Sequence, residues 1–253
     1  MSSGKLTPEQ IEAFEHDGYL LCRGFFDPAR TAEIQRWTGE LQALPETPGR
    51  HMMYFEPSLR DGRRLLSRME NFYPFHAGFH ALFDSDDLRG SVAQLFGEPA
   101  VLFKDKINFK LPGGDGFKAH QDVQAGWNTY ASLHISVLVC IDEATAENGC
   151  LELVAGKHNH GLVGDLWRPL SDDEMAGSAY VSCPTLPGDV VFFDSFAPHR
   201  SGPNNTGKQR RMLYVTYNRA SEGDSRAQYY ADKRKSYPPD CEREPGKEYV
   251  FRV

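Results

Sequence analysis

His120 and Asp122, separated by one residue in His120-Gln121-Asp122, have the residue types and the spacing to hold a metal ion. In a strand, side chains two residues apart point to the same face, so the imidazole and the carboxylate could bind one ion together. Two histidines and one carboxylate on one face of an octahedron hold iron in non-haem Fe(II) oxygenases and leave positions open. The three-residue motif arises often by chance. The alternative interpretation of the motif is a histidine and an aspartate at a strand edge that contact only water.

A second histidine, His199, supplies the missing ligand of such a set. It follows the apolar stretch Asp189-Val-Val-Phe-Phe-Asp194 and a short turn that ends at Pro198. This order predicts a buried strand that presents His199 at its exit. Taken alone, His199 is better explained as a hydrogen-bonded core or turn histidine. With His120 and Asp122, it completes a predicted iron site.

Two neighbouring arginines, Arg210 and Arg211, begin the next predicted strand, and Arg210 lies eleven residues after His199. A guanidinium group matches a carboxylate with two parallel hydrogen bonds. Such a clamp would suit the far carboxylate of a dicarboxylate that binds iron through its other end. Strand alternation places the two arginines on opposite faces, so only one can point inward, and the alternation does not decide which.

A row of cationic residues alternates with other residues in a strand predicted around residues 101–111. Lys104, Lys106, Asn108 and Lys110 share one face of this strand. If that face is internal, the lysines would favour anionic ligands beside the metal site. A solvated lysine row above an apolar inner face is an equally good interpretation. The row is therefore a candidate substrate site.

The elements that must position these residues change in type along the chain. Thr7-Pro8-Glu9-Gln10 predicts a capped helix, Tyr19–Cys22 a strand, and Asp27-Pro28 the start of a second helix. We predict a long loop, and a lid, at 45–66, and another helix at Asp86–Phe96. From about residue 100, short runs rich in β-branched and aromatic residues predict strands. Together these features predict a mainly β protein with α-helices, in which a jelly-roll barrel is flanked by N-terminal helices.

Length and composition exclude several classes of protein. The 253 residues predict a single domain over 1–253, with a mainly helical flank and lid at 1–98, the jelly-roll core at 99–220 and a C-terminal segment at 221–253. A net charge of -7 does not favour a nucleic-acid partner. Five cysteines without a CxxC pair favour free thiols in a cytoplasmic protein. No apolar run predicts a signal peptide or a membrane span.

An ordered set of motifs resembles the phytanoyl-CoA dioxygenase superfamily of Fe(II)/2-oxoglutarate oxygenases over nearly the whole chain. The motifs include the N-terminal Leu6–Leu20 segment, Lys106-Ile-Asn108, His120-Gln-Asp122, Gly156-Lys-His158, Pro187-Gly-Asp189 and Pro198-His199-Arg-Ser-Gly. The resemblance implies a double-stranded β-helix (cupin-like) core. It also implies that His120, Asp122 and His199 bind Fe(II), and that 2-oxoglutarate and dioxygen are co-substrates.

The same resemblance implies roles for residues around the iron. It places the 2-oxoglutarate clamp at Arg210 and further 2-oxoglutarate contacts at Asn108, Ser201 and Trp127, although the spacing of Trp127 differs by one residue. Because Asp122 retains its carboxylate, the resemblance implies hydroxylation rather than halogenation. The C-terminal half also resembles bacterial 2-aminoethylphosphonate dioxygenases, in Lys106–Gly114 and Tyr217–Asp224.

These observations predict a hydroxylase of a small anionic or zwitterionic molecule, with an aminophosphonate such as 2-aminoethylphosphonate as the first candidate substrate. Alternatives are an amino-acid-like or acyl substrate, a cupin-type metal protein without 2-oxoglutarate, and a hydrolase with Zn²⁺ on the same residues. A cupin-type protein would not need Arg210. A long acyl chain would need an apolar groove that no segment of the sequence indicates.

Overall fold

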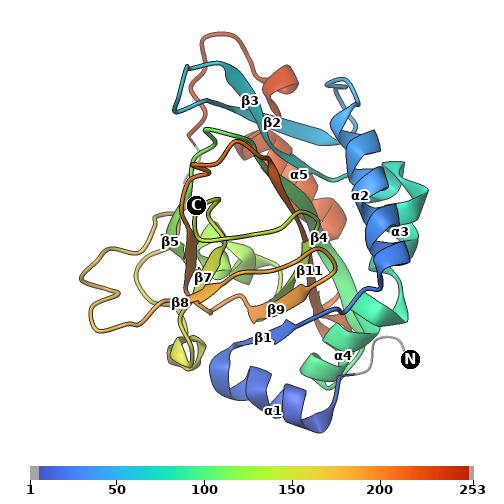
Figure 1. Cartoon of the computed structure of the whole chain (residues 1–253), viewed down its shortest axis with the longest axis vertical. Coiled ribbons are helices and arrows are strands. Elements are labelled where there is room, and N and C mark those ends of the chain that lie inside the picture. Colours follow the sequence, from blue (N-terminus) through green and yellow to red (C-terminus); the bar gives the residue numbers. More distant parts are fainter. Residues whose placement is uncertain (1–5, 251–253) are drawn as a thin grey trace.

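Two antiparallel β-sheets face each other at the centre of the molecule, and helices cover the outer face of the larger sheet (Figure 1). The computed structural model describes residues 6–250. Within them, the larger sheet has the strand order β1 (Tyr19–Cys22), β9 (Val190–Asp194), β6 (His134–Cys140), β11 (Arg210–Arg219), β4 (Ala100–Lys110), β3 (Arg64–Glu70) and β2 (Met52–Pro57). The smaller sheet has the order β5 (Phe117–His120), β10 (His199–Ser201), β7 (Leu151–Leu153) and β8 (Val181–Cys183).

Within residues 6–250, four α-helices precede β4 in the chain and one follows β11. They are α1 (Pro8–Asp17), α2 (Pro28–Gln42), α3 (Ala77–Phe83), α4 (Ser91–Phe96) and α5 (Arg226–Ser236). A π-helical turn, η2 (Asp86–Gly90), precedes α4, and short 3-10 turns are η1 (Tyr73–Phe75), η3 (Asp122–Ala125), η4 (Trp127–Thr129), η5 (Lys157–His160), η6 (Ala220–Glu222) and η7 (Asp240–Glu242). Within residues 6–250, no helix is both long and apolar enough to cross a membrane.

Local sequence explains where the first helix begins and ends. The side chain of Thr7 accepts a hydrogen bond from the backbone of Gln10, and the side chain of Gln10 accepts one from the backbone of Thr7. These two bonds satisfy orphan N–H groups at the helix start. Gly18 ends the helix with a φ of 78°, a left-handed conformation that glycine adopts without strain. The predicted capped helix and the following strand β1 are confirmed.

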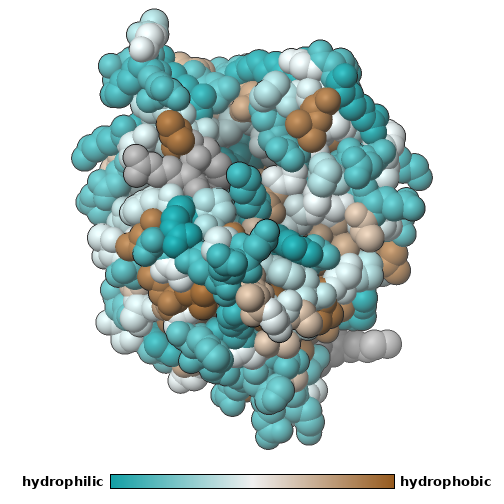
Figure 2. Space-filling model, turned by 90° about the vertical axis from the view of Figure 1, so that its left-hand side faces the viewer, coloured by the Kyte–Doolittle hydropathy of each residue, from teal (hydrophilic) through white to brown (hydrophobic). Residues whose placement is uncertain are grey.

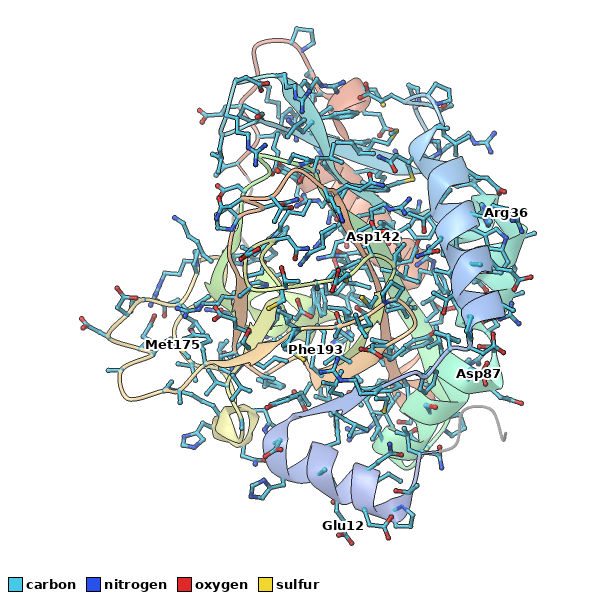
Figure 3. The ribbon with its side chains drawn as sticks, viewed as in Figure 1. Glu12, Arg36, Asp87, Asp142, Met175 and Phe193 are labelled. Carbon is cyan, nitrogen blue, oxygen red and sulfur yellow. The ribbon has the colours of Figure 1, made fainter. Side chains whose placement is uncertain are left out.

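Alternation in the central strands divides the core into two layers. Val137 and Val139 of β6 pack with the helices, whereas Leu138 and Cys140 lie between the sheets. Figure 3 shows Phe193 in the interior, while Glu12 and Arg36 point outward from α1 and α2. The side chains of β4 and β11 that face the smaller sheet therefore line the space in which a site could form. The predicted mainly β fold with helices outside is confirmed.

The segment 45–66 is not the long loop that its composition predicts. Residues 52–57 form β2, which pairs with β3 (64–70) as an antiparallel hairpin at the edge of the larger sheet. Prolines, glycines and charges gather before β2 and at the hairpin tip, and they hide two short apolar runs. Met52 and Met69 are fully buried in these runs, and burial of such side chains favours strand pairing over an open loop.

Candidate metal centre

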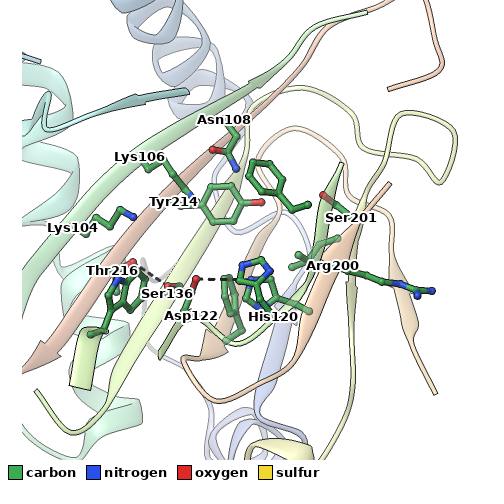
Figure 4. Close-up of a pocket in the computed structure, with 15 residues that line it drawn as sticks. Lys104, Lys106, Asn108, His120, Asp122, Ser136, Arg200, Ser201, Tyr214 and Thr216 are labelled. Carbon is green, nitrogen blue, oxygen red and sulfur yellow. Dashed lines mark hydrogen bonds and ion pairs between the residues drawn. The ribbon is translucent and has the colours of Figure 1, made fainter. Parts of the chain in front are cut away.

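Two side chains from neighbouring strands and one from the turn that follows one of them converge on one point. His120 ends β5, His199 begins β10, and the two residues are partners in the register of the smaller sheet. Their ring centroids lie 4.2 Å apart. Ligand atoms of His120, Asp122 and His199 all lie within 4.8 Å of one another, and His199 Nε2 lies 3.9 Å from Asp122 Oδ1 (Figure 4). This spacing is suited to one metal ion.

Asp122 reaches this point from a turn rather than from the strand that we predicted. Strand β5 ends at His120, and Asp122 is the first residue of η3. The turn is held by the buried Gln121, whose side-chain amide donates to the carbonyl oxygens of Gly161 (2.8 Å) and Phe196 (2.6 Å). Convergence of the two side chains therefore depends on Gln121 and the loops that it joins, and strand alternation alone does not explain it.

Backbone contacts orient both imidazole rings. Nδ1 of His120 lies 2.7 Å from the carbonyl oxygen of Lys118, and Nδ1 of His199 lies 3.0 Å from that of Ala197. A carbonyl oxygen only accepts, so each Nδ1 carries the proton and each Nε2 offers its lone pair to the site. Burial lowers the pKa of His120 to about 3 and also lowers the pKa of His199. Both rings are therefore neutral near pH 7, as metal ligands require.

The carboxylate of Asp122 is held by the hydroxyl group of Ser136, which in turn contacts the hydroxyl group of Thr216; we did not predict either contact. Ser136 Oγ donates to Asp122 Oδ2 at 2.8 Å and lies 3.0 Å from Thr216 Oγ1. Burial raises the pKa of Asp122, but attraction by His199 and His120 in their protonated forms, and by Lys106, outweighs burial and lowers the pKa overall. A sequence signal did exist, because Ser136 interrupts an otherwise apolar strand and Thr216 shares the face of Arg210.

Asn108 and Ser201 line one end of the pocket. Lys110 and Arg210 lie directly behind them, since Lys110 contacts Ser201 and is the cross-strand partner of Arg210. These four residues are here called the inner end. Arg210 is only 1% exposed, and its Nε and Nη1 have no hydrogen-bond partner within residues 6–250. Arg211 points the other way and binds Asp142 through Nε (2.7 Å) and Nη2 (2.9 Å). Arg210 is thus the inward arginine of the pair. A buried guanidinium with unpartnered N–H groups is costly unless an anion joins it.

The other members of the inner end surround this guanidinium. Lys110 donates to Ser201 Oγ at 2.9 Å and to the Gly202 carbonyl oxygen at 2.5 Å. Burial, reinforced by the charge of Arg210, lowers the pKa of Lys110 to about 6. Asn108 Oδ1 is buried without a partner within residues 6–250. Of the predicted substrate lysines, Lys110 therefore lies with Arg210, and it does not line the pocket around the triad.

Lys104 and Lys106 point into the pocket, where they lie near aromatic side chains (Figure 4). Lys106 Nζ lies 4.7 Å from the ring centroid of Tyr214, and Lys104 Nζ lies 5.2 Å from that of Trp127. Burial and the charge of Lys104 lower the pKa of Lys106 to about 7. The row is therefore internal, and the interpretation as a solvated outer row is wrong.

Trp127 lies beside Lys104, so the structure places it away from the inner end. Lys104 and Lys110 are six residues apart on β4, which separates their backbone positions by about 20 Å at about 3.3 Å per residue. From Lys104 the pocket continues into an outer cavity of about 690 Å³, which is bordered by β3, α5 and residues 247–250. The triad lies between the inner end and this cavity, since His120 and Asp122 line both pockets.

Comparisons with known proteins agree with this geometry. The phytanoyl-CoA dioxygenase family matches residues 14–212. A 2-aminoethylphosphonate dioxygenase of the uncultured bacterium HF130_AEPn_1 is 40% identical, over 96% of this chain and 93% of its own. A methylphosphonate hydroxylase of Gimesia maris is 39% identical, over 92% of this chain and 88% of its own.

Solved structures support the fold. The crystal structure of EctD from S. alaskensis with 2-oxoglutarate and 5-hydroxyectoine superimposes with a TM-score of 0.73 at 21% identity, over 88% of this chain and 79% of that one. The resemblance predicted from the motifs is confirmed by these matches. The chain belongs to the phytanoyl-CoA dioxygenase family and is an oxygenase.

Proposed function

We propose that this protein is an Fe(II)- and 2-oxoglutarate-dependent hydroxylase of small organophosphonates, with 2-aminoethylphosphonate as its leading substrate. One observation carries the proposal. Two neutral histidines and a carboxylate converge at a pocket whose inner end holds the buried, unpartnered guanidinium of Arg210. A dicarboxylate that reached from the triad to Arg210 would satisfy both groups.

The donor set fits iron. Two imidazole nitrogens and one carboxylate oxygen are the ligands of non-haem Fe(II) oxygenases, and open positions remain for other ligands. His120, Asp122 and His199 would hold the ion, and Ser136 would keep the carboxylate of Asp122 in place. When bound, Fe(II) with 2-oxoglutarate and dioxygen supplies the oxidation that places a hydroxyl group on a C–H carbon of the substrate.

The inner end fits 2-oxoglutarate. Arg210 can form two parallel hydrogen bonds to the carboxylate far from the metal, and Asn108 and Ser201 offer further polar groups at the same end. Tyr214 and Phe193 line the pocket between this end and the triad. These side chains would exclude water from the co-substrate and fix its orientation.

The substrate proposal rests on the relatives and on the lysines. Two relatives at about 40% identity are named for reactions on phosphonates. Lys104 and Lys106 place cationic groups beside the triad, where a phosphonate needs several donors to offset its loss of hydration. A long acyl substrate fits less well, because charged and aromatic side chains line the outer cavity. On the face shown in Figure 2, apolar side chains form only small, separate groups.

A two-stage experiment tests the proposal. Anaerobic titration of the protein with Fe(II) and then 2-oxoglutarate should produce the charge-transfer absorption of the chelate, which a Zn²⁺ hydrolase would not show. Succinate formation is then measured with 2-aminoethylphosphonate, methylphosphonate, amino acids and acyl-CoA esters. We expect the strongest stimulation by a phosphonate. Stimulation by an acyl-CoA ester or an amino acid alone would overturn the substrate, and no response to 2-oxoglutarate would overturn the reaction.

A further inference from the structure

Three cationic side chains surround one buried carboxylate in the wall of the outer cavity. Glu70 of β3 is 1% exposed. Its Oε2 accepts a hydrogen bond from Lys233 Nζ of α5 at 2.6 Å and lies 3.9 Å from Lys104 Nζ of β4. Its Oε1 lies 3.1 Å from Arg68 Nε of β3. We call Arg68, Glu70, Lys104 and Lys233 the cation cluster.

The cation cluster carries more positive charge than Glu70 can neutralise. Lys104 and Lys233 already outnumber the one carboxylate that they share, and all three side chains are largely removed from water. Buried ion pairs stabilise a fold poorly even when the charges balance, because desolvation opposes the attraction between them. An unbalanced set is worse, since like charges repel at close range. Burial and the neighbouring cations also lower the pKa of Lys233, against the attraction of Glu70. An anion in the cavity would relieve this imbalance.

The surroundings of the cation cluster are suited to a small anion that reaches the triad. Arg68, Lys104 and Lys233 line the outer cavity together with His120 and Asp122. Trp127 also lines it, and its buried indole Nε1–H has no acceptor within residues 6–250. The rings of Trp127 and Tyr229 lie 5.2 and 5.6 Å from Lys104 Nζ and confine this ammonium group. Donors thus converge on a space beside the metal ligands.

We propose that the cation cluster is an oxyanion subsite, in which Arg68, Lys104 and Lys233 bind the phosphonate group of the substrate while its carbon chain faces the triad. This inference rests on the proposed function and extends it to residues of β3 and α5, outside the strands that hold the metal ligands. A phosphonate has three oxygens and up to two negative charges, whereas a carboxylate has two oxygens and one. A site with three cations therefore distinguishes the two groups by charge and by the number of hydrogen bonds.

Binding, measured separately from turnover, tests the subsite. Calorimetric titrations would be carried out anaerobically on the full chain loaded with Fe(II) and 2-oxoglutarate. The titrated ligands are 2-aminoethylphosphonate, inorganic phosphate and β-alanine, which is the carboxylate analogue of 2-aminoethylphosphonate. Lys233→Met and Arg68→Met each remove one cation. The matched control is Lys208→Met, which removes the same charge from an exposed position between β10 and β11. Lys233→Gln keeps a hydrogen bond to Glu70 and serves if Lys233→Met does not fold.

We expect Lys233→Met and Arg68→Met to weaken phosphonate binding at least about tenfold, the usual effect of losing a hydrogen bond to a charged group. The preference for 2-aminoethylphosphonate over β-alanine should shrink as well, and Lys208→Met should match the wild type. Equal phosphonate affinity in the wild type and in folded Lys233 variants would overturn the subsite, even if the wild type hydroxylates phosphonates. A different outcome is also informative: phosphate binds only when Lys233 is present, but no phosphonate stimulates succinate formation. This result would support the anion subsite and overturn the proposed substrate.

Discussion

The inner end of the pocket, around Arg210, and the outer end, around Glu70, both hold buried positive charge, but only the outer end supplies its own counter-ion. Within residues 6–250, Arg210 forms no ion pair, whereas Glu70 contacts three cationic side chains. A lone buried guanidinium favours a tightly held anionic partner. A partly neutralised cluster attracts an anion less strongly and can release it more easily.

The two ends also come from different parts of the chain. The inner end is built by β4, β10 and β11 of the facing sheets, whereas Arg68 and Glu70 come from the β2–β3 hairpin and Lys233 comes from α5. We infer that the facing sheets hold the metal and the co-substrate, and that the flanking segments select the substrate. Predictions that separate the two ends test this division of roles.

The largest expected effect lies between the two ends. His120→Ala, Asp122→Ala and His199→Ala should each lower succinate formation by about a thousandfold or more, because the three ligands act as a unit. Iron content should fall in parallel, while circular dichroism should show a retained fold. Wild-type turnover in any one of these variants would remove that residue from the proposed centre.

At the inner end, Arg210→Lys should raise the KM for 2-oxoglutarate at least about tenfold, because lysine keeps the charge but loses the two-pronged geometry. The KM for the phosphonate should change much less. Arg211→Lys is the matched control, since Arg211 binds Asp142 on the other face of β11. A larger rise in the KM for 2-oxoglutarate in Arg211→Lys than in Arg210→Lys would show that Arg211, and not Arg210, binds the far carboxylate.

The inner end shows how far sequence periodicity can lead. Alternation along β11 places Arg210 and Arg211 on opposite faces. To decide which of them points inward, the contact that one of the two arginines makes must be known. That partner is Asp142, 69 positions away in the chain. The lysine row has the same ambiguity. Its inward orientation follows from the packing of the opposite face of β4, where Ile107 and Phe109 lie in the core beneath the helices, and no single strand reveals this packing.

The outer end could not be predicted, for a physical reason. Prolines, glycines and charges at 45–50 and 58–63 hide the short apolar runs of the β2–β3 hairpin, and local composition therefore favoured a loop. The pair formed by Glu70 and Lys233 spans 163 positions. In contrast, the caps of α1 and the apolar run of β9 are local signals, and this helix and this strand were predicted.

Lys106 lies between the two ends and sharpens the comparison. Its ammonium group lies near Tyr214, and its side chain lines both the pocket around the triad and the outer cavity. Lys106→Met should raise the KM for the phosphonate about tenfold, the effect of one lost hydrogen bond to a charged group, with a smaller rise for 2-oxoglutarate. Steady-state kinetics with each compound varied in turn would measure both constants. An effect confined to 2-oxoglutarate would assign Lys106 to the inner end.

The smallest expected effect concerns Lys110, which sequence placed with the substrate lysines and the structure places beside Arg210. Lys110→Met should raise the KM for 2-oxoglutarate a few-fold and leave the KM for the phosphonate nearly unchanged. The sign of the pH dependence follows from the pKa of Lys110, which is lowered to about 6. Below this pH the ammonium is charged and attracts the dicarboxylate, and above it the free protein loses that charge. Because a bound dicarboxylate raises the pKa of Lys110, 2-oxoglutarate affinity should weaken as the pH rises from about 6 towards 8.

Lys110→Met should flatten this pH dependence. Calorimetric titrations with 2-oxoglutarate between pH 5.5 and pH 8, with the metal present, would measure this pH dependence. If Lys110 becomes protonated when 2-oxoglutarate binds, the protein takes up a proton. Titrations in two buffers of different ionisation enthalpy would detect this proton uptake. Arg211→Lys serves again as the control and should keep the wild-type slope. A rise in the KM for the phosphonate in Lys110→Met, with an unchanged 2-oxoglutarate profile, would contradict the division between the two ends. The charge of Lys110 would then act on the substrate across the pocket, despite its contacts with Ser201 and Gly202.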